Sequence, residues 1–171
     1  MTETINVIIV DDHLVVREGI SSVLDYADGI EVIGQASNAE EALDQINRLS
    51  PDIILMDLRM PGVDGIQLTR TILRTKPHCK IIILTLYDQF VSEAVAAGAS
   101  GYLLKDISGE ELISAIKQVY GGETVFDKKV KLTVNVEYET PQLEDNVIGQ
   151  DEEKRSSEKL SFYEQIKIFM L

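Results

Sequence analysis

Four short runs of apolar residues are the strongest constraint on what this chain can fold into. They cover residues 5–10, 53–56, 81–86 and 101–104, and each ends at or beside a residue with a reactive or charged side chain. Runs this continuous are typical of strands that are buried on both faces of a parallel sheet. A weaker apolar pattern at residues 31–36 predicts a further strand nearer an edge.

Helical patterns separate these strands. Two potential capping boxes mark helix starts, because Asn38 is followed three residues later by Glu41 and Ser108 by Glu111. Five alternating strands and helices predict an α/β fold with a doubly wound parallel sheet and helices on both faces. The expected helices are residues 14–26, the segment from Asn38 to Ser50-Pro51, the segment from Gly65 to Pro77, residues 89–97 before Gly98, and the segment from Ser108 to Gly121-Gly122.

Residues at the carboxyl ends of the predicted strands carry the chemistry. In a doubly wound sheet these ends meet at the functional crevice, which brings together side chains that are distant in sequence. Packed carboxylates repel one another, and Mg²⁺ relieves this while leaving positions for phosphate oxygens. A carboxylate beside the metal can then attack phosphorus and form an aspartyl phosphate. The residues expected to converge are Asp11, Asp12, Asp57, Thr85 and Lys105.

The same stretches resemble the receiver domain of response regulators, specifically the NarL/FixJ type. The resemblance covers residues 5–122 and implies a flavodoxin-like five-stranded sheet of order 2-1-3-4-5. The matching motifs are VDDH at 10–13, MDLRMPGVDG at 56–65, LT at 84–85 and AGASGYLLKD at 97–106.

The resemblance also implies a role for each site residue. Asp57 is the expected phosphoacceptor. Asp12 and Asp57 are the expected side-chain ligands of Mg²⁺, with Asp11 acting mostly through water and the backbone carbonyl of Arg59 as a further ligand. Thr85 is the expected switch hydroxyl and Lys105 the expected phosphate contact. Tyr102 occupies the position of the switch aromatic.

Each assignment has a simpler alternative. Lys105 could be a surface lysine, Thr85 a residue chosen for its strand propensity, and Tyr102 a side chain that covers the core. His13, His78 and Cys79 show no metal-ligand spacing, and structural or exposed roles fit them better. Asp64 and Asp106 are expected to be caps or turn residues.

One departure from the family pattern lies after Thr85, where the loop before the fourth helix is shorter than usual. In receivers, the residues two positions after the acceptor and after the switch hydroxyl control attack by water. Here these are Arg59 and Tyr87. Neither orients water well, and we therefore expect slow autodephosphorylation.

Composition limits the location and the partners. The net charge is −13, and both residues 1–122 and residues 123–171 hold more acidic than basic residues, which disfavours DNA binding by this chain alone. No apolar run is long enough to cross a bilayer, and the N-terminus lacks the pattern of a signal peptide. With a single cysteine, a cytoplasmic location fits best.

Residues 123–171 are expected to form an extension. Residues 130–138 alternate between apolar and polar as a half-buried strand does, residues 139–159 read as an acidic linker, and residues 160–171 as a terminal helix. This last segment resembles the start of a LuxR-type helix-turn-helix, and we favour truncation of a longer DNA-binding regulator. The strand and helix also predict self-association into a homodimer through residues 128–171.

Three functions remain open on the sequence. The first is a phosphorylation-controlled signalling module, partnered by a sensor histidine kinase and not itself an enzyme. The second is a Mg²⁺-dependent phosphatase with an aspartyl nucleophile, disfavoured because Arg59 stands where that chemistry needs a second acid. The third is a pseudo-receiver that binds partners without phosphorylation, disfavoured because no residue of the acidic pocket is missing.

Overall fold

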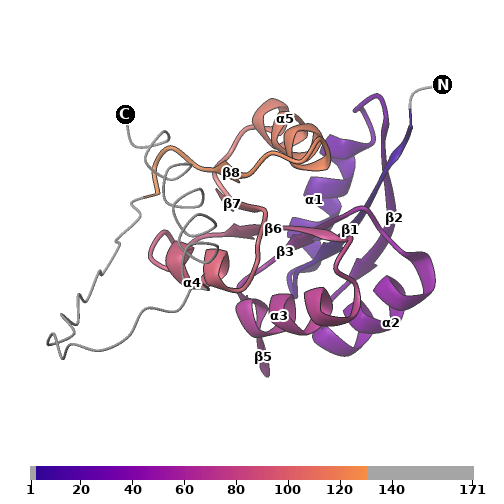
Figure 1. Ribbon diagram of the computed structural model, residues 1–171. Coiled ribbons are helices and arrows are strands. Elements are labelled where there is room, and N and C mark those ends of the chain that lie inside the picture. The colour runs from indigo at the N-terminus through magenta and orange to yellow at the C-terminus, as the bar shows by residue number, and fades with distance from the viewer. Residues whose placement is uncertain (1–2, 131–171) are drawn as a thin grey trace, which may run out of the picture. The chain divides into compact units, whose positions relative to one another are not determined.

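A computed structural model of the chain describes residues 3–130. Residues 131–138 of the expected strand 130–138, the expected linker 139–159 and the expected helix 160–171 lie outside the described residues. Within the described part, no helix is long and apolar enough to span a bilayer. Figure 1 shows the elements, which are β1 Ile5–Val10, α1 Leu14–Leu24, β2 Ile30–Ala36, α2 Ala39–Leu49, β3 Ile53–Met56, β4 Arg59–Met60, β5 Val63–Asp64, α3 Gly65–Thr75, β6 Lys80–Thr85, α4 Val91–Ala96, β7 Gly101–Leu104, α5 Gly109–Tyr120 and β8 Val125–Phe126.

The central sheet is parallel throughout, with strand order β2-β1-β3-β6-β7-β8. Its first five strands are the five expected from the sequence, in the order 2-1-3-4-5. The strands β3 and β6 lie at its centre and their apolar residues are buried on both faces, as the continuous apolar runs predicted.

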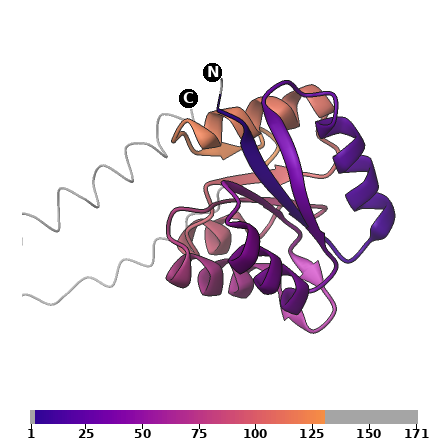
Figure 2. The same ribbon diagram turned by 90° about the vertical axis from the view of Figure 1, so that its right-hand side faces the viewer.

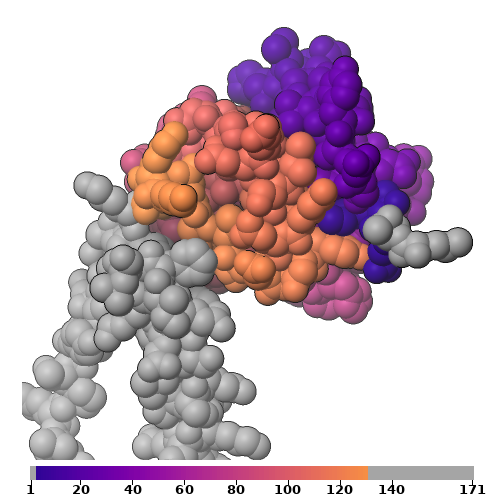
Figure 3. Space-filling model, turned by 90° about the horizontal axis from the view of Figure 1, so that it is seen from above, coloured from indigo at the N-terminus to yellow at the C-terminus, as the bar shows by residue number. Residues whose placement is uncertain are grey.

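The helices cover both faces of the sheet (Figure 2), and each face has its own apolar core. One core joins α2, α3 and α4 to residues such as Ile54 and Ile83, and the other joins α1 and α5 to their strand neighbours Leu55 and Ile82. The helices α1 and α5 are in contact, and Figure 3 shows their surfaces side by side. Alternate residues of one strand therefore stabilise opposite layers.

Local signals in the sequence account for several helix ends. Ser108 and Glu111 form the expected reciprocal capping box at the start of α5. Asn38 caps α2 by accepting from the Glu41 amide at 3.0 Å, but the Glu41 carboxylate accepts from the amide of Ser37 rather than that of Asn38. The α2 helix ends at Leu49, before Ser50-Pro51, as predicted.

Two features were not expected from the sequence. The loop after β3 contains a short antiparallel pair, β4 with β5, in which Arg59 lies opposite Asp64. The segment after α5 adds a sixth strand, β8, whose residue Phe126 pairs with Tyr102 of β7. The sheet therefore continues beyond Gly122, into the segment that we expected to be an extension.

Gly65 joins the acceptor loop to α3 so closely that a larger residue cannot fit. A Cβ atom at this position would overlap the carbonyl oxygen of Asp57, which is backbone and cannot turn aside. We expect Gly65→Ala to reduce the free energy of unfolding by about 1–3 kcal/mol, as overpacking typically does. Urea denaturation followed by circular dichroism measures this.

Gly19 supplies the matched control, because it lies inside α1 and a Cβ there would meet nothing within 4 Å. Gly19→Ala should stabilise the protein by about 0.5–1 kcal/mol through helix propensity. If the two substitutions change the free energy of unfolding equally, the backbone does not approach Gly65 as closely as described.

Candidate functional site

Three side chains from three strand ends meet in one buried cluster. Asp11 follows β1, Asp57 follows β3 and Lys105 follows β7, so the parallel sheet delivers all three to the same edge. The Lys105 Nζ lies 2.6 Å from Asp11 Oδ2 and 3.1 Å from Asp57 Oδ1. The side chains of Asp11 and Asp57 are only 3% and 5% exposed, which makes Lys105 their principal counter-charge.

Burial and neighbouring charge act in opposite directions on this cluster. Burial raises the pKa of Asp57, aided by the charge of Asp11, while Lys105 opposes the rise. Burial by itself would lower the pKa of Lys105, but its contacts with Asp11 and Asp57 outweigh burial and raise it. The lysine is therefore held in its charged form between the two carboxylates.

Asp12 and His13 complete the acidic edge. Within residues 3–130, the buried Asp12 Oδ1 atom accepts no hydrogen bond, although Nδ1 of the exposed His13 ring lies 3.0 Å from it. The same Nδ1 lies 3.2 Å from Asp11 Oδ1. Sequence reasoning gave His13 no part in the site, and its position directly after two acids was the only signal that could have suggested one.

The carboxylates lie close enough together to hold a divalent cation. Oxygen atoms of Asp11, Asp12 and Asp57, with a nitrogen of His13, lie within 4.8 Å of one another. The buried Asp12 oxygen without a hydrogen-bond donor is the strongest sign that a cation fits here. Carboxylate oxygens suit Mg²⁺, whereas the histidine nitrogen is not needed for it.

Thr85 and Tyr102 occupy neighbouring strands next to this cluster. Both are fully buried, and both contact the backbone of Tyr87. The Tyr87 amide donates to Thr85 Oγ1 at 3.3 Å, and the Tyr102 hydroxyl donates to the Tyr87 carbonyl at 2.6 Å. Burial raises the pKa of Tyr102 to about 12, so its hydroxyl remains a donor. Tyr102 therefore lies in the core, as its simpler alternative expected, and its role as the switch aromatic stays a prediction.

Two arginines near the site have contacts that the sequence did not predict. Arg17 of α1 donates from Nη1 to the Asp11 carbonyl at 2.6 Å and so anchors the acidic loop. Arg59 of β4 is exposed and places its guanidinium over the rings of Tyr87 and Phe90. The role of the Arg59 backbone carbonyl as a metal ligand stays a prediction.

Several other expectations concern residues away from the cluster. Asp64 caps α3 by accepting from the Ile66 amide, as expected of a cap. His78 is exposed, whereas Cys79 is buried and donates to the Pro51 carbonyl. Asp106 is exposed and pairs with Lys129 at 2.7 Å.

The family model of the response regulator receiver domain matches residues 7–117. The chain belongs to this family. Among curated relatives, this receiver domain is similar to the response regulator GacA of Pseudomonas aeruginosa, with 37% identity over 83% of this chain and 67% of that protein. It is also similar to the oxygen regulatory protein NreC of Staphylococcus carnosus, with 39% identity over 77% of this chain and 62% of that protein. The chain spans 60% to 67% of the length of the GacA proteins it matches.

Solved structures agree with this family. A LuxR-family two-component response regulator from Aurantimonas sp. SI85-9A1 matches with a TM-score of 0.69 and 36% identity, covering 72% of this chain and 89% of that one. The isolated REC domain of RcsB from Salmonella enterica serovar Typhimurium, studied with the phosphomimetic BeF3⁻, matches with a TM-score of 0.68 and 28% identity. That match covers 74% of this chain and 95% of the RcsB chain. Receiver domains of this family are generally signalling rather than catalytic domains.

Removing the positive charge of Lys105 should leave the buried carboxylates without a counter-charge and lower the free energy of unfolding. We expect Lys105→Met to destabilise the protein by about 3–5 kcal/mol at neutral pH, because breaking a buried ion pair leaves charge without compensation. The pKa of Asp57, already above its ordinary 3.8, would rise further. In the folded variant, Asp57 would then bind a proton at a pH where the unfolded chain releases it. The loss of unfolding free energy relative to the wild type should therefore shrink as the pH falls from about 7 to about 4.

The measurement is denaturation in the absence of divalent cations at several pH values. Lys129→Met is the control, since its pair with Asp106 is exposed and screened by solvent and should contribute little to stability. If the stability lost in Lys105→Met is not partly regained at lower pH, then the buried charge of the carboxylates is not its cause.

Proposed function

We propose that this protein is a response regulator that is phosphorylated on Asp57 by a sensor histidine kinase with Mg²⁺ and thereby changes conformation. The observation that carries the proposal is the shared contact of Lys105 with Asp11 and Asp57 at the sheet edge. In the full-length protein, the relatives named as regulators favour control of transcription as the output. Binding to DNA would require a complete helix-turn-helix.

The chemistry follows from the residues. An Asp57 carboxylate oxygen forms a bond to phosphorus while the nitrogen–phosphorus bond of a donor phosphohistidine breaks, and the electron pair returns to the imidazole. Lys105 is released from Asp57 and can contact a phosphoryl oxygen, and the Thr85 hydroxyl can donate to another. Mg²⁺ held by Asp11, Asp12, Asp57 and the Arg59 carbonyl would supply charge neutralisation when bound.

An apolar groove beside the site supports a protein donor. It has a volume of about 340 Å³ and lies between α1 and α5, where Ile20, Val23, Leu86 and Ile107 line it next to Lys105. Leu86 is 74% exposed, and Val15 on α1 is 79% exposed. Apolar side chains left in water around a reactive carboxylate favour a docking surface for the kinase.

The phosphatase alternative is weak because it needs an acid two residues after the nucleophile. Arg59 occupies that position, and its side chain packs on aromatic rings. Self-association through residues 128–171 falls almost wholly outside the described residues and stays a prediction, as does the cytoplasmic location.

Labelling with acetyl phosphate and Mg²⁺, read by intact mass, tests the proposal. A single phosphoryl adduct is expected on the wild type and none on Asp57→Asn, because an amide is not a competent nucleophile. Chelation of Mg²⁺ should also prevent labelling. Asp88→Asn is the control, since Asp88 is an exposed acid near the same rim, and it should be labelled like the wild type. Continuous turnover would favour the phosphatase, and an unlabelled wild type the pseudo-receiver.

The lifetime of the adduct follows from Arg59 and Tyr87, neither of which is suited to orienting an attacking water. We expect the purified phosphoprotein to keep its phosphoryl group for many minutes or longer, as followed by intact mass after removal of the donor. A half-life of seconds would show that water reaches Asp57 freely.

A further inference from the structure

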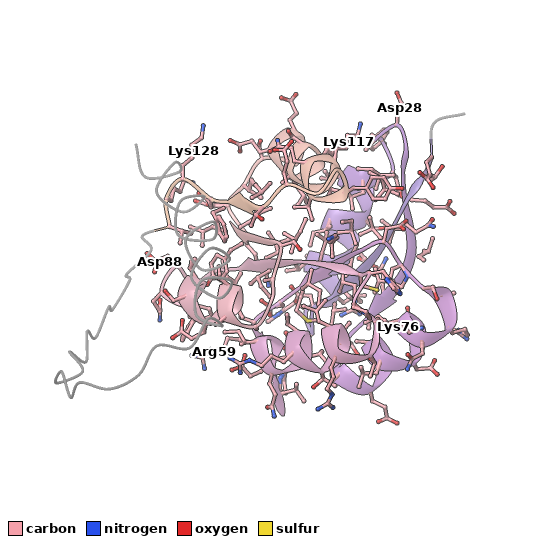
Figure 4. The ribbon with its side chains drawn as sticks, in the orientation of Figure 1. Asp28, Arg59, Lys76, Asp88, Lys117 and Lys128 are labelled. Carbon is pink, nitrogen blue, oxygen red and sulfur yellow. The ribbon has the colours of Figure 1, made fainter. Side chains whose placement is uncertain are left out.

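The Arg59 side chain bridges two loops that border the acceptor. Arg59 lies two residues after Asp57, and its guanidinium carbon is 5.3 Å from the centroid of the Tyr87 ring and 5.2 Å from that of Phe90. The two rings meet edge to face with centroids 6.1 Å apart. We call Tyr87 and Phe90 the aromatic seat. Figure 4 shows Arg59 at the rim of the domain, on the side of α4.

The charge of Arg59 has no acidic partner in the part of the chain that the structure describes. The ion pairs found within residues 3–130 involve His13, Lys105 and Lys129, and none involves Arg59. A cation over the face of an exposed ring is a weak interaction. A hydrogen bond between guanidinium and phosphate is stronger and bidentate. A phosphoryl group on Asp57 would therefore compete well for Arg59.

The aromatic seat is joined to the parts that respond to phosphorylation. The Tyr87 amide donates to the Thr85 hydroxyl oxygen, and the Tyr87 carbonyl accepts from the Tyr102 hydroxyl. Phe90 is the N-cap residue of α4, and its side chain packs against the same core as Tyr102. Whatever moves the seat consequently moves the backbone that holds both buried side chains.

We propose that the aromatic seat holds the Arg59 guanidinium in the unphosphorylated protein and loses it to the phosphoryl group on Asp57. Arg59 is thus a positioning residue whose transfer between the two partners loosens the loop before α4. This inference rests on the proposed function, because it requires a phosphoryl group at Asp57. It adds Phe90 and the competition for Arg59 to the roles already described.

NMR of the arginine side-chain Nε–H groups tests directly whether the Arg59 guanidinium leaves the aromatic seat. The Nε–H signal of Arg59, assigned by its absence in Arg59→Lys, should be shielded by the rings in the free full-length protein. Adding Mg²⁺ and BeF3⁻, a phosphoryl mimic, should remove the shielding. Persistent shielding in a protein whose Asp57 amide signal shows that BeF3⁻ has bound would overturn the proposal.

Affinity for BeF3⁻ at fixed Mg²⁺ provides the second test, through a double-mutant cycle. Phe90→Leu removes part of the seat, and it should tighten BeF3⁻ binding about two- to fivefold, the equivalent of about 0.5–1 kcal/mol. Arg59→Met should weaken binding, and adding Phe90→Leu to Arg59→Met should change nothing more. Tyr26→Leu is the control for loss of a ring, because Tyr26 is 91% exposed at the end of α1.

The outcomes separate this inference from the proposed function. If Phe90→Leu tightens BeF3⁻ binding equally with and without Arg59, Phe90 acts through packing alone. That result would overturn the proposal that the aromatic seat holds Arg59. A wild-type protein that binds no BeF3⁻ and takes no label from acetyl phosphate would instead refute phosphorylation at Asp57, and the inference with it.

Discussion

The shared lysine contact is the interaction on which the rest of the site depends. Two carboxylates with almost no exposure repel each other, and Lys105 lies between them as the positive charge that lets them stay close. A parallel sheet is what allows this, because β1, β3 and β7 all deliver their last residues to one edge. A phosphoryl group on Asp57, as proposed above, would compete with both acids for Lys105.

Much of the fold could be predicted because its signals are local and repeated. Strands such as β3 and β6 are runs of apolar residues buried on both sides, and α5 begins at a capping box that Ser108 and Glu111 specify. The strand β8 could not be predicted in this way. Two residues, Val125 and Phe126, have no periodicity, and they become a strand only because β7 offers free backbone partners. The β4–β5 pair is equally short and equally dependent on its surroundings.

The candidate site also has a part that the sequence predicts and a part that it does not. The meeting of Asp11, Asp57 and Lys105 follows from topology, and a sequence that identifies the strands identifies the cluster. Contacts between side chains of different loops do not follow from it. The stacking of Arg59 on Tyr87 and Phe90 depends on how far two loops extend and at what angle, which no pattern in residues 57–59 or 85–90 specifies. The buried hydroxyl of Tyr102 and its bond to the Tyr87 carbonyl depend on the same loop.

The strand β8 has a consequence for how this domain behaves in a crowded solution. Without it, the apolar strand β7 would present unpaired amides and carbonyls along an open margin, the kind of template that recruits a strand from another molecule. Three hydrogen bonds remove that template: the Val125 amide donates to the Ser100 carbonyl, the Asp127 amide donates to the Tyr102 carbonyl, and the Asp127 carboxylate accepts from the Leu104 amide at 3.3 Å. Among the described residues, this margin is bordered by a strand of two residues followed by an acid and two lysines, which is short and charged and therefore a poor template for another strand.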